Sequence, residues 1–300
     1  MKKIAVLMGG QSSEREVSLL SGHNVAEALK SLGKYEIVPV DLTSDSLAGM
    51  PTDVDAAYIA LHGGWGESGG VQAALDRLGI PYTGPGARAS ATAMDKIKTK
   101  VVLEAAGVPT APWATVSSDA DHSPLPLPVV VKPPCDGSSV GISKVTGPEQ
   151  WAEALKRAAV GRTDGEILVE AFVPGREFTI AVVDGEAWPV IEIVAKGGWY
   201  GYDEKYNSDE TRYPFLADGA LASRLQALAL AAYRAIGCRG VTRVDFRVSP
   251  EGNAYVLELN TSPGFTSHSL VPKAGMETGL TFAGVCERIL ASAACDRSDA

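Results

Sequence analysis

Two carboxylates and one amide in the last third of the chain have a spacing that can hold a divalent cation. Asp245 lies in an apolar run that begins at Arg243, and Glu258 and Asn260 end a second apolar run. Residues two apart on a strand share a face, and a hairpin turning at 250–253 can bring Asp245 to the face of the other two. Such oxygen ligands suit Mg²⁺ or Mn²⁺, which proteins usually hold together with substrate phosphates. The pattern therefore predicts a metal-bound nucleotide, and two surface strands with solvated charges are the alternative.

Residues 129–143 form a second segment whose side chains could take part in binding or catalysis. An apolar run ends at Lys132, a turn follows with Ser138 and Ser139, and Gly141 starts a return strand. Glycines let backbone N–H groups approach phosphate oxygens, serine hydroxyls add donors, and a lysine adds positive charge. The segment is not a P-loop, because it lacks both that motif and the helix that follows it. It predicts phosphate binding, with an ordinary hairpin turn as the alternative.

The composition limits the class of protein. A chain of 300 residues predicts two or three domains, and its net charge of -9 argues against nucleic acid as the main partner. The four cysteines show no metal-binding spacing, which predicts reduced thiols in a cytoplasmic protein. We expect no membrane span because no apolar run approaches ~18 residues, and the N-terminus has no signal-peptide pattern.

The elements that must position these residues change character near residue 95. The earlier part alternates apolar strands with helices, which predicts an open parallel sheet. The strands are expected at 3–8, 37–40 and 56–61, and the helices at 14–32 and 70–78. Later strands at 129–132 and 141–144 are expected to be antiparallel, with helices at 96–106, 149–159, 221–236 and 282–293. We expect three parts, at 1–95, 96–178 and 179–300.

Further motifs, taken in chain order with these two, resemble the D-alanine–D-alanine ligase family of the ATP-grasp superfamily. They lie at residues 9–18, 62–69, 82–84, 94–96, 173–178, 202–211 and 260–272. The resemblance extends over nearly the whole chain. It implies an ATP-grasp fold, in which an N-terminal α/β domain with an open parallel sheet precedes two α+β lobes that enclose ATP.

The resemblance also implies a reaction. ATP phosphorylates the carboxylate of one D-alanine, and the amine of a second D-alanine attacks the acyl phosphate. The products are D-alanyl-D-alanine, ADP and phosphate, for peptidoglycan synthesis in the cytoplasm. The family further implies two Mg²⁺ or Mn²⁺ ions on Asp245, Glu258 and Asn260, and a homodimer.

Catalytic and substrate roles follow by matching positions. Glu14 would hold the ammonium of the first D-alanine, and His62 would lie by its carboxylate. Tyr206, in the aperiodic stretch 197–214, would close over the site and join a hydrogen-bond set with Ser138 and Glu14. Its presence favours a dipeptide product over D-alanyl-D-lactate. The remaining matches are Arg243 for the developing oxyanion, and Ser269 and Leu270 for the carboxylate of the second D-alanine.

Nucleotide roles follow in the same way. Lys96 and Lys132 would bind phosphates, and Lys205 would reach the phosphate being transferred. Glu170 would meet the adenine amino group and Glu177 the ribose hydroxyls. The other matching nucleotide residues are Ser139, Phe172 and Val173.

Several alternatives stay open at the level of residues alone. Glu14 could be a first-turn helix glutamate, His62 a satisfied structural group, and Arg243 an ion-pair partner of Asp245. Ser269 could be a helix cap and Leu270 a core residue. At the level of function, the rivals are a depsipeptide ligase that accepts D-lactate and a non-catalytic nucleotide-binding module. A Rossmann dehydrogenase is disfavoured because its glycine motif and paired acid are missing.

Overall fold

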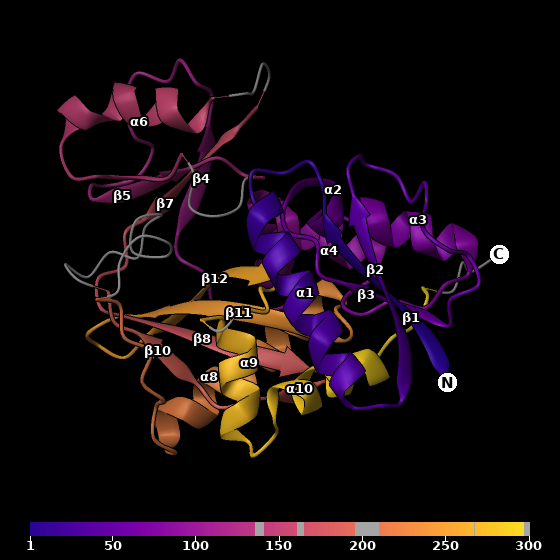
Figure 1. The fold of residues 1–300 in the computed structure, drawn as a ribbon. Coiled ribbons are helices and arrows are strands. Elements are labelled where there is room, and N and C mark those ends of the chain that lie inside the picture. The colour runs from indigo at the N-terminus through magenta and orange to yellow at the C-terminus, as the bar shows by residue number, and fades with distance from the viewer. Residues whose placement is uncertain (136–140, 161–164, 196–209, 267, 297–300) are drawn as a thin grey trace.

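The computed structural model describes residues 1–135, 141–160, 165–195, 210–266 and 268–296 of the chain. Within these residues the strands form one parallel and two antiparallel sheets. Figure 1 shows the parallel sheet at the right, a small antiparallel sheet at the upper left and the largest sheet below it. No helix in the described ranges is both long and apolar enough to cross a membrane.

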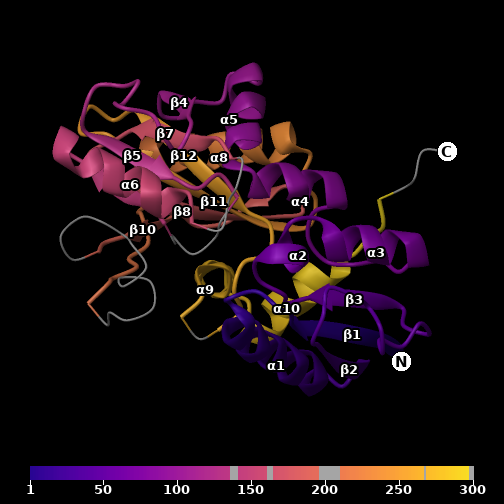
Figure 2. The same cartoon turned by 90° about the horizontal axis from the view of Figure 1, so that it is seen from above.

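The parallel sheet expected at the start of the chain is confirmed. Strand β1 (Lys2–Gly9) lies between β2 (Tyr35–Leu42) and β3 (Ala56–Ile59) and pairs with both in parallel. Helices α1 (Arg15–Ser31) and α3 (Gly70–Leu78) cover its opposite faces, as Figure 2 shows. Because both faces of β1 are buried, its sequence is a continuous apolar run instead of an alternating one.

Two helices between the parallel sheet and the next lobe turn the chain toward the site. Helix α4 (Ala87–Met94) was not expected from the sequence, and α5 (Lys96–Ala105) was. They meet at Asp95, whose carboxylate caps α5 by accepting N–H groups from Ile97 and Lys98, each at 3.1 Å. This cap fixes the start of α5, and with it the position of Lys96.

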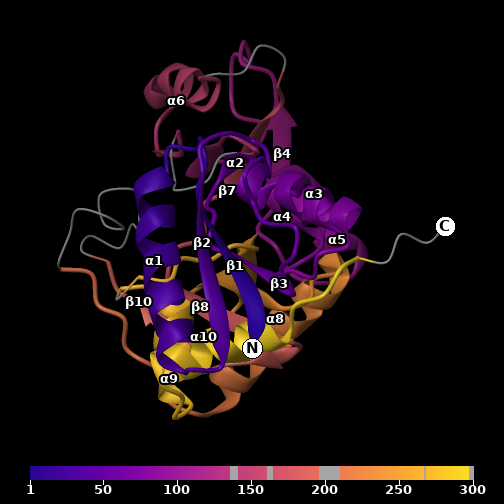
Figure 3. The same ribbon diagram turned by 45° about the vertical axis from the view of Figure 1, so that its right-hand side comes forward.

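The central lobe is a four-stranded antiparallel sheet in the order β4-β7-β5-β6. One face packs against α6 (Trp151–Ala158), which follows a short 3₁₀ turn, η1 (Pro148–Gln150), and Figure 3 shows α6 on the outer side of this sheet. Alternation along the strands leaves Lys132 and Glu170 on the opposite face. The strands are β4 (Trp113–Val116), β5 (Val129–Lys132), β6 (Ser143–Val145) and β7 (Ile167–Ala171).

The largest sheet has the order β10-β8-β11-β12, with the short β9 paired to β8. Helix α8 (Ala220–Ile236) packs on one of its faces. The strands are β8 (Arg176–Val183), β9 (Glu186–Ala187), β10 (Ile191–Ile193), β11 (Val241–Val248) and β12 (Ala254–Asn260). Strand β8 runs across residue 178, where we expected the boundary between the second and third parts, so a domain division there stays a prediction.

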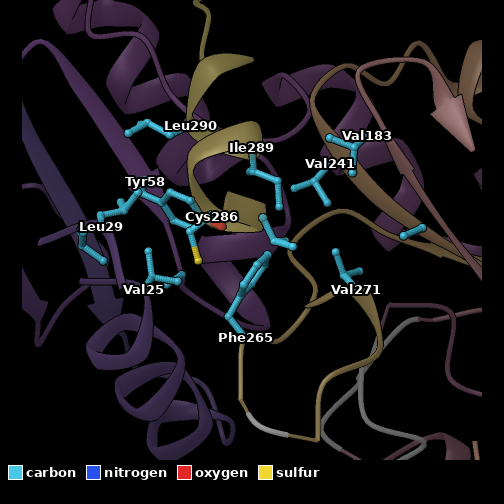
Figure 4. Close-up of a cluster of buried hydrophobic side chains, with 14 of the residues drawn as sticks. Val25, Leu29, Tyr58, Val183, Val241, Phe265, Val271, Cys286, Ile289 and Leu290 are labelled. Carbon is cyan, nitrogen blue, oxygen red and sulfur yellow. The ribbon is translucent and has the colours of Figure 1, made fainter. Parts of the chain in front are cut away.

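One hydrophobic core joins the first and last parts of the chain. Helices α9 (Leu270–Glu277) and α10 (Phe282–Ala291) lie between the parallel sheet and the largest sheet. Figure 4 shows side chains from α1, β3, β8, β11 and α10 meeting around Phe265. The rings of Tyr58 and Phe265 pack edge to face with centroids 5.8 Å apart. This shared core holds the N-terminal domain against the lobe that carries the predicted metal ligands.

Two leucines on α1 provide a matched test of this core. Leu29 is fully buried in it, whereas Leu20 is 53% exposed. We expect Leu29→Ala to lower the free energy of unfolding by about 2–5 kcal/mol, because it removes buried methyl groups and leaves a cavity. Leu20→Ala should stay within about 0.5 kcal/mol of the original chain. Urea denaturation of both variants measures this, and equal losses would show that the core does not depend on α1.

Candidate active site

The hairpin of β11 and β12 brings the predicted metal ligands together. Asp245 lies directly opposite Glu258, and Arg243 lies opposite Asn260. The register shifts just after Asp245, so Glu258 and Asn260 share a face with Asp245 while Val256 returns to the core. The expectation that pairing across the turn gathers these three polar groups is therefore confirmed.

Asp245 is buried and surrounded by donors. Arg243 donates two hydrogen bonds to its carboxylate, from Nε to Oδ1 at 3.0 Å and from Nη2 to Oδ2 at 2.8 Å. Thr179 donates its hydroxyl to Oδ1 at 2.6 Å, and Asn260 donates its amide Nδ2 to Oδ2 at 3.0 Å. The ion pair considered for Arg243 is thus present, and it places the guanidinium beside the proposed metal ligands.

These side chains can hold a hard divalent cation only if a ligand such as a nucleotide supplies further oxygen atoms. In the described ranges no three His, Cys, Asp or Glu side chains gather as a metal site. Asp245 and Glu258 supply two carboxylates, and Asn260, which uses its nitrogen toward Asp245, keeps a carbonyl oxygen as a third donor. Mg²⁺ is commonly held by one or two carboxylates together with phosphate oxygens. The set therefore suits a cation that arrives with a nucleotide.

Lys96 connects the hairpin to the start of α5. Its ammonium lies 3.5 Å from Oε2 of Glu258, and its side chain is only 8% exposed. Its backbone N–H donates to the carbonyl of Pro134 at 2.8 Å, at the edge of the predicted phosphate loop. A predicted phosphate lysine and a predicted metal ligand therefore lie side by side.

On the central sheet, Lys132 and Glu170 form a buried ion pair that faces away from α6. A second lysine, Lys100 on α5, pairs with the other oxygen of the same carboxylate. Burial opposes the charge on Glu170, but the two ammonium groups outweigh it and hold its pKa below the ordinary value. Burial likewise opposes the charge on Lys132, yet Glu170 raises the pKa of this lysine. Glu170 is therefore ionised at neutral pH.

Arg247 gathers three of the expected nucleotide residues. Its Nη1 donates to Oε2 of Glu177 at 3.0 Å, and its Nε donates to the carbonyl of Val173 at 3.3 Å. Its guanidinium lies 5.8 Å from the ring centroid of Phe172, which also has the ammonium of Lys144 at 3.7 Å. Arg247 shares the face of β11 that holds Arg243 and Asp245. Through Arg247, the residues predicted to contact the base and the ribose are thus in contact with β11, the strand that carries the predicted metal ligand Asp245.

At the other end of the site, Glu14 directly precedes α1. A Cβ atom placed on Gly63 would come within 2.8 Å of Oε2 of Glu14, and Gly63 has a φ of +64°. The glycine is thus required both for its backbone and for the space that the carboxylate occupies. The chain here holds a carboxylate against the loop that follows β3.

His62 has both ring nitrogens engaged. Nδ1 donates to the carbonyl of Ser262 at 2.9 Å, and Nε2 lies 2.9 Å from the hydroxyl of Ser21. That hydroxyl accepts the N–H of Phe265 at 3.1 Å, so it donates its own proton to Nε2. Burial lowers the pKa of His62 despite the nearby Glu14 carboxylate, which agrees with this neutral tautomer. The expected contact with a substrate carboxylate stays a prediction, and it must replace or share one of these bonds.

Glu67 lies in the same loop and had no role in the sequence-based prediction. Its Oε2 accepts the N–H of Gly63 at 3.1 Å. Burial, together with the charge of Glu14, raises the pKa of Glu67 to about 7. Two carboxyl groups therefore border Gly63, and at neutral pH one of them is partly protonated.

Ser269 and Leu270 mark the start of α9. The hydroxyl of Ser269 accepts the N–H of Thr266 at 2.8 Å, and the side chain of Leu270 joins the shared hydrophobic core. Their backbone N–H groups stand at a helix N-terminus, where anions are favoured. Leu270 thus has the core role, whereas Ser269 occupies the cap position without a side-chain hydrogen bond to the helix, and carboxylate binding stays a prediction. Four further predicted site residues lie outside the described ranges: Ser138, Ser139, Lys205 and Tyr206.

Comparison with known proteins gives consistent results. A family model described as D-ala D-ala ligase C-terminus matches residues 102–291, and one described as D-ala D-ala ligase N-terminus matches residues 3–50. A D-alanine–D-alanine ligase of Bordetella petrii is 45% identical over 304 residues, covering 98% of this chain and 92% of that protein. One of Bordetella pertussis is 46% identical, covering 98% and 95%. The chain belongs to the D-alanine–D-alanine ligase family.

Solved structures of the family share the fold. A D-alanine–D-alanine ligase of Bacillus anthracis complexed with ATP superimposes with a TM-score of 0.85 at 32% identity, and 97% of each chain is covered. A second structure of that ligase gives 0.86 at 33% identity. The expected ATP-grasp architecture, an α/β domain followed by two α+β lobes, is therefore confirmed.

Three residues that contact the candidate site residues were not found from the sequence: Glu67, Lys100 and Arg247. Arg247 was within reach, because it continues the alternation of Arg243 and Asp245 on one strand. Glu67 stands among glycines after a buried strand, which is a weaker signal. Lys100 gave no signal, because its partner Glu170 lies on a different element seventy positions along the chain.

The raised pKa of Glu67 predicts a pH-dependent effect on stability. An acid whose folded pKa lies near 7 instead of 4.5 destabilises the fold progressively as pH rises through that interval. Glu67→Gln keeps an acceptor for Gly63 but cannot ionise. We expect this variant to be more stable than the original chain at pH 8, by at most about 3 kcal/mol, with the gain disappearing near pH 4.5.

Denaturation midpoints of the ligand-free protein at pH 5 and pH 8 measure this effect. Glu277→Gln is the control, because Glu277 is exposed at the end of α9 and its replacement should change stability by no more than about 0.5 kcal/mol. A Glu67→Gln effect that does not depend on pH would show that Glu67 does not carry the raised pKa.

Proposed function

We propose that this chain ligates two D-alanines to D-alanyl-D-alanine at the expense of ATP, through a D-alanyl phosphate. The observation that carries the proposal is the row of charge along β11, β12 and α5. There Arg243, Asp245 and Glu258 lie together, and the ammonium of Lys96 is 3.5 Å from Glu258. A row of two acids and two cations suits a nucleotide triphosphate with its cation, and the family relationship supplies the substrates.

The nucleotide would lie between the central and largest sheets. Lys96 and Lys132 would bind its phosphates together with Ser139 and Lys205, and Glu170 would accept a hydrogen bond from the adenine amino group. Phe172, Val173 and Glu177, which Arg247 draws together, would border the base and ribose. Asp245, Glu258 and Asn260 would hold two Mg²⁺ or Mn²⁺ ions. When bound, such ions neutralise phosphate charge and orient the group being transferred.

The amino acids would bind between this nucleotide site and the first domain. Glu14 would pair with the ammonium of the first D-alanine, and Arg243 would stabilise the oxyanion that develops on its carboxyl carbon. The N-terminus of α9, at Ser269 and Leu270, would hold the carboxylate of the second D-alanine. Tyr206 and Ser138 would complete the enclosure with Glu14. Catalysis would then come mostly from positioning two substrates and placing positive charge where negative charge develops.

The setting follows from the same proposal. All four cysteines are free thiols, which supports action in a reducing cytoplasm, in the supply of peptidoglycan precursors. We propose a homodimer as the working unit.

Substrate choice is the direct test of the proposal. With ATP and Mg²⁺, the purified protein should release phosphate only when D-alanine is present, and mass spectrometry should identify D-alanyl-D-alanine. Replacing D-alanine by L-alanine should abolish turnover. A chain that couples D-alanine to D-lactate in preference to a second D-alanine is instead a depsipeptide ligase. Tight ATP binding without turnover would show a nucleotide-binding module.

Glu258 tests the metal ligands. Glu258→Gln keeps the shape of the side chain but removes one negative ligand, so we expect kcat to fall by roughly 10²-fold or more, on the scale of several kcal/mol of transition-state stabilisation. Glu251→Gln is the matched control on the same hairpin, because Glu251 is exposed at the turn, and its kcat should be unchanged. Equal rates for the two variants would make Glu258 a surface charge.

A further inference from the structure

Helix α5 carries two buried lysines one turn apart that reach different sheets. Lys96 extends to Glu258 on the largest sheet, and Lys100 extends to Glu170 on the central sheet. Lys100 is only 1% exposed. A fully buried lysine is rare, because losing its hydration is costly unless it is paired and hydrogen-bonded. A lysine buried against Glu170 therefore calls for a specific role.

Lys100 is held in place by fixed acceptors. Its ammonium donates to the hydroxyl of Thr110 at 2.5 Å and to the carbonyl of Ala111 at 3.3 Å, in addition to the ion pair with Glu170. The hydroxyl of Thr110 in turn donates to the carbonyl of Val256 on β12 at 3.1 Å. Two hydrogen bonds and one ion pair thus hold the ammonium of Lys100, so it cannot move away from Glu170 without breaking contacts that join α5, the segment before β4 and β12.

Lys132 is placed differently on the same carboxylate. It ends β5, next to the predicted phosphate loop, and its side chain is 11% exposed. With Lys100 and Lys132 both on Glu170, the cluster carries one positive charge more than it needs for neutrality. A triphosphate entering beside β5 attracts the lysine that is able to move. Glu170 then keeps Lys100 as its counter-ion, and its Oε2, which had paired with Lys132, becomes available to another hydrogen-bond donor.

We propose that Lys100 is the permanent counter-ion of Glu170 and positions that carboxylate to select adenine, whereas Lys132 is an exchangeable partner that transfers to phosphate. The inference rests on the nucleotide site of the proposed function. Lys100 occupies Oε1, so Oε2 faces the base once Lys132 has moved. The exocyclic amine of adenine donates to such an oxygen. Guanine presents a carbonyl oxygen at the same position, which an ionised carboxylate repels.

Equilibrium binding of ADP and GDP to the full chain separates the two lysines. We expect Lys100→Met to weaken ADP binding by about tenfold, the scale of a charge-assisted hydrogen bond, and to lower the preference for ADP over GDP. The loss should grow as pH falls from 8 to 6, because Glu170 without its permanent counter-ion takes up a proton. Lys132→Met should weaken the binding of ADP and the binding of GDP by the same factor. Lys98→Met, on the exposed side of the same helix, should change neither.

A double variant guards against simple misfolding. Glu170→Gln combined with Lys100→Met removes the carboxylate together with its permanent counter-ion, so that no orphaned carboxylate is left and Lys132 is the one remaining charge of the cluster. If Lys100 acts through Glu170, this double variant has the same ADP-to-GDP ratio as Glu170→Gln alone. A further drop in the ratio, or a Lys100→Met loss that is equal for ADP and GDP and independent of pH, overturns the inference.

The same variants distinguish a failure of this inference from a failure of the proposed function. If Glu170→Gln keeps the original ADP preference, then Glu170 does not contact the base, and the nucleotide site itself is wrongly assigned. If Glu170→Gln lowers the preference and Lys100→Met does not, the base contact stands and only the role of Lys100 fails.

Discussion

The site depends on the alternation of side chains along paired strands. Strands β5, β7, β11 and β12 each give one face to a hydrophobic core, with α6 in the central lobe and α8 in the largest sheet. The other face is then available for charge, and these sequences fill it with lysines, arginines and acids. A slip of one residue in any register would move the charges into the core. The apolar side chains on one face of each strand therefore determine where the charged side chains on the other face lie.

Burying so much charge is tolerated because each group has a partner of opposite sign. Asp245 meets Arg243, Glu177 meets Arg247, and Glu170 meets two lysines. Such pairs seldom add much net stability, because desolvation offsets the attraction between the charges. Their value lies in position: in a medium of low polarity each group is fixed before a ligand arrives. His62 follows the same logic without a charge, since its neutral ring joins α1 to the segment before α9.

The sequence predicted the site where the partners are close along the chain. The turn between β11 and β12 is short, so the hairpin and the shared face of Glu258 and Asn260 could be inferred from period and turn composition. An unbroken register counted back from the turn would set Asp245 opposite Leu257, and it is the register shift after Asp245, which the sequence did not predict, that sets it opposite Glu258. The parallel sheet could be inferred from its buried apolar runs. Helix α4 was missed because its small residues carry little periodicity. Lys100 was missed for another reason: its role is created by packing α5 against two sheets, and no local pattern encodes such a contact.

The shared core has a consequence for how the protein is made. Ser21, on α1, bonds to Phe265, 244 residues further along the chain, and α10 completes the hydrophobic surface beneath β3. At translation rates of 5–20 residues per second, the first domain emerges roughly 10–40 s before these covering segments exist. Its sheet and α1 can pack together early, but the apolar surface of α1 and β3 that contacts Phe265 and α10 stays uncovered until the last helices are synthesised. The first domain is therefore a poor candidate for independent expression, and the nascent chain needs protection from aggregation during that interval.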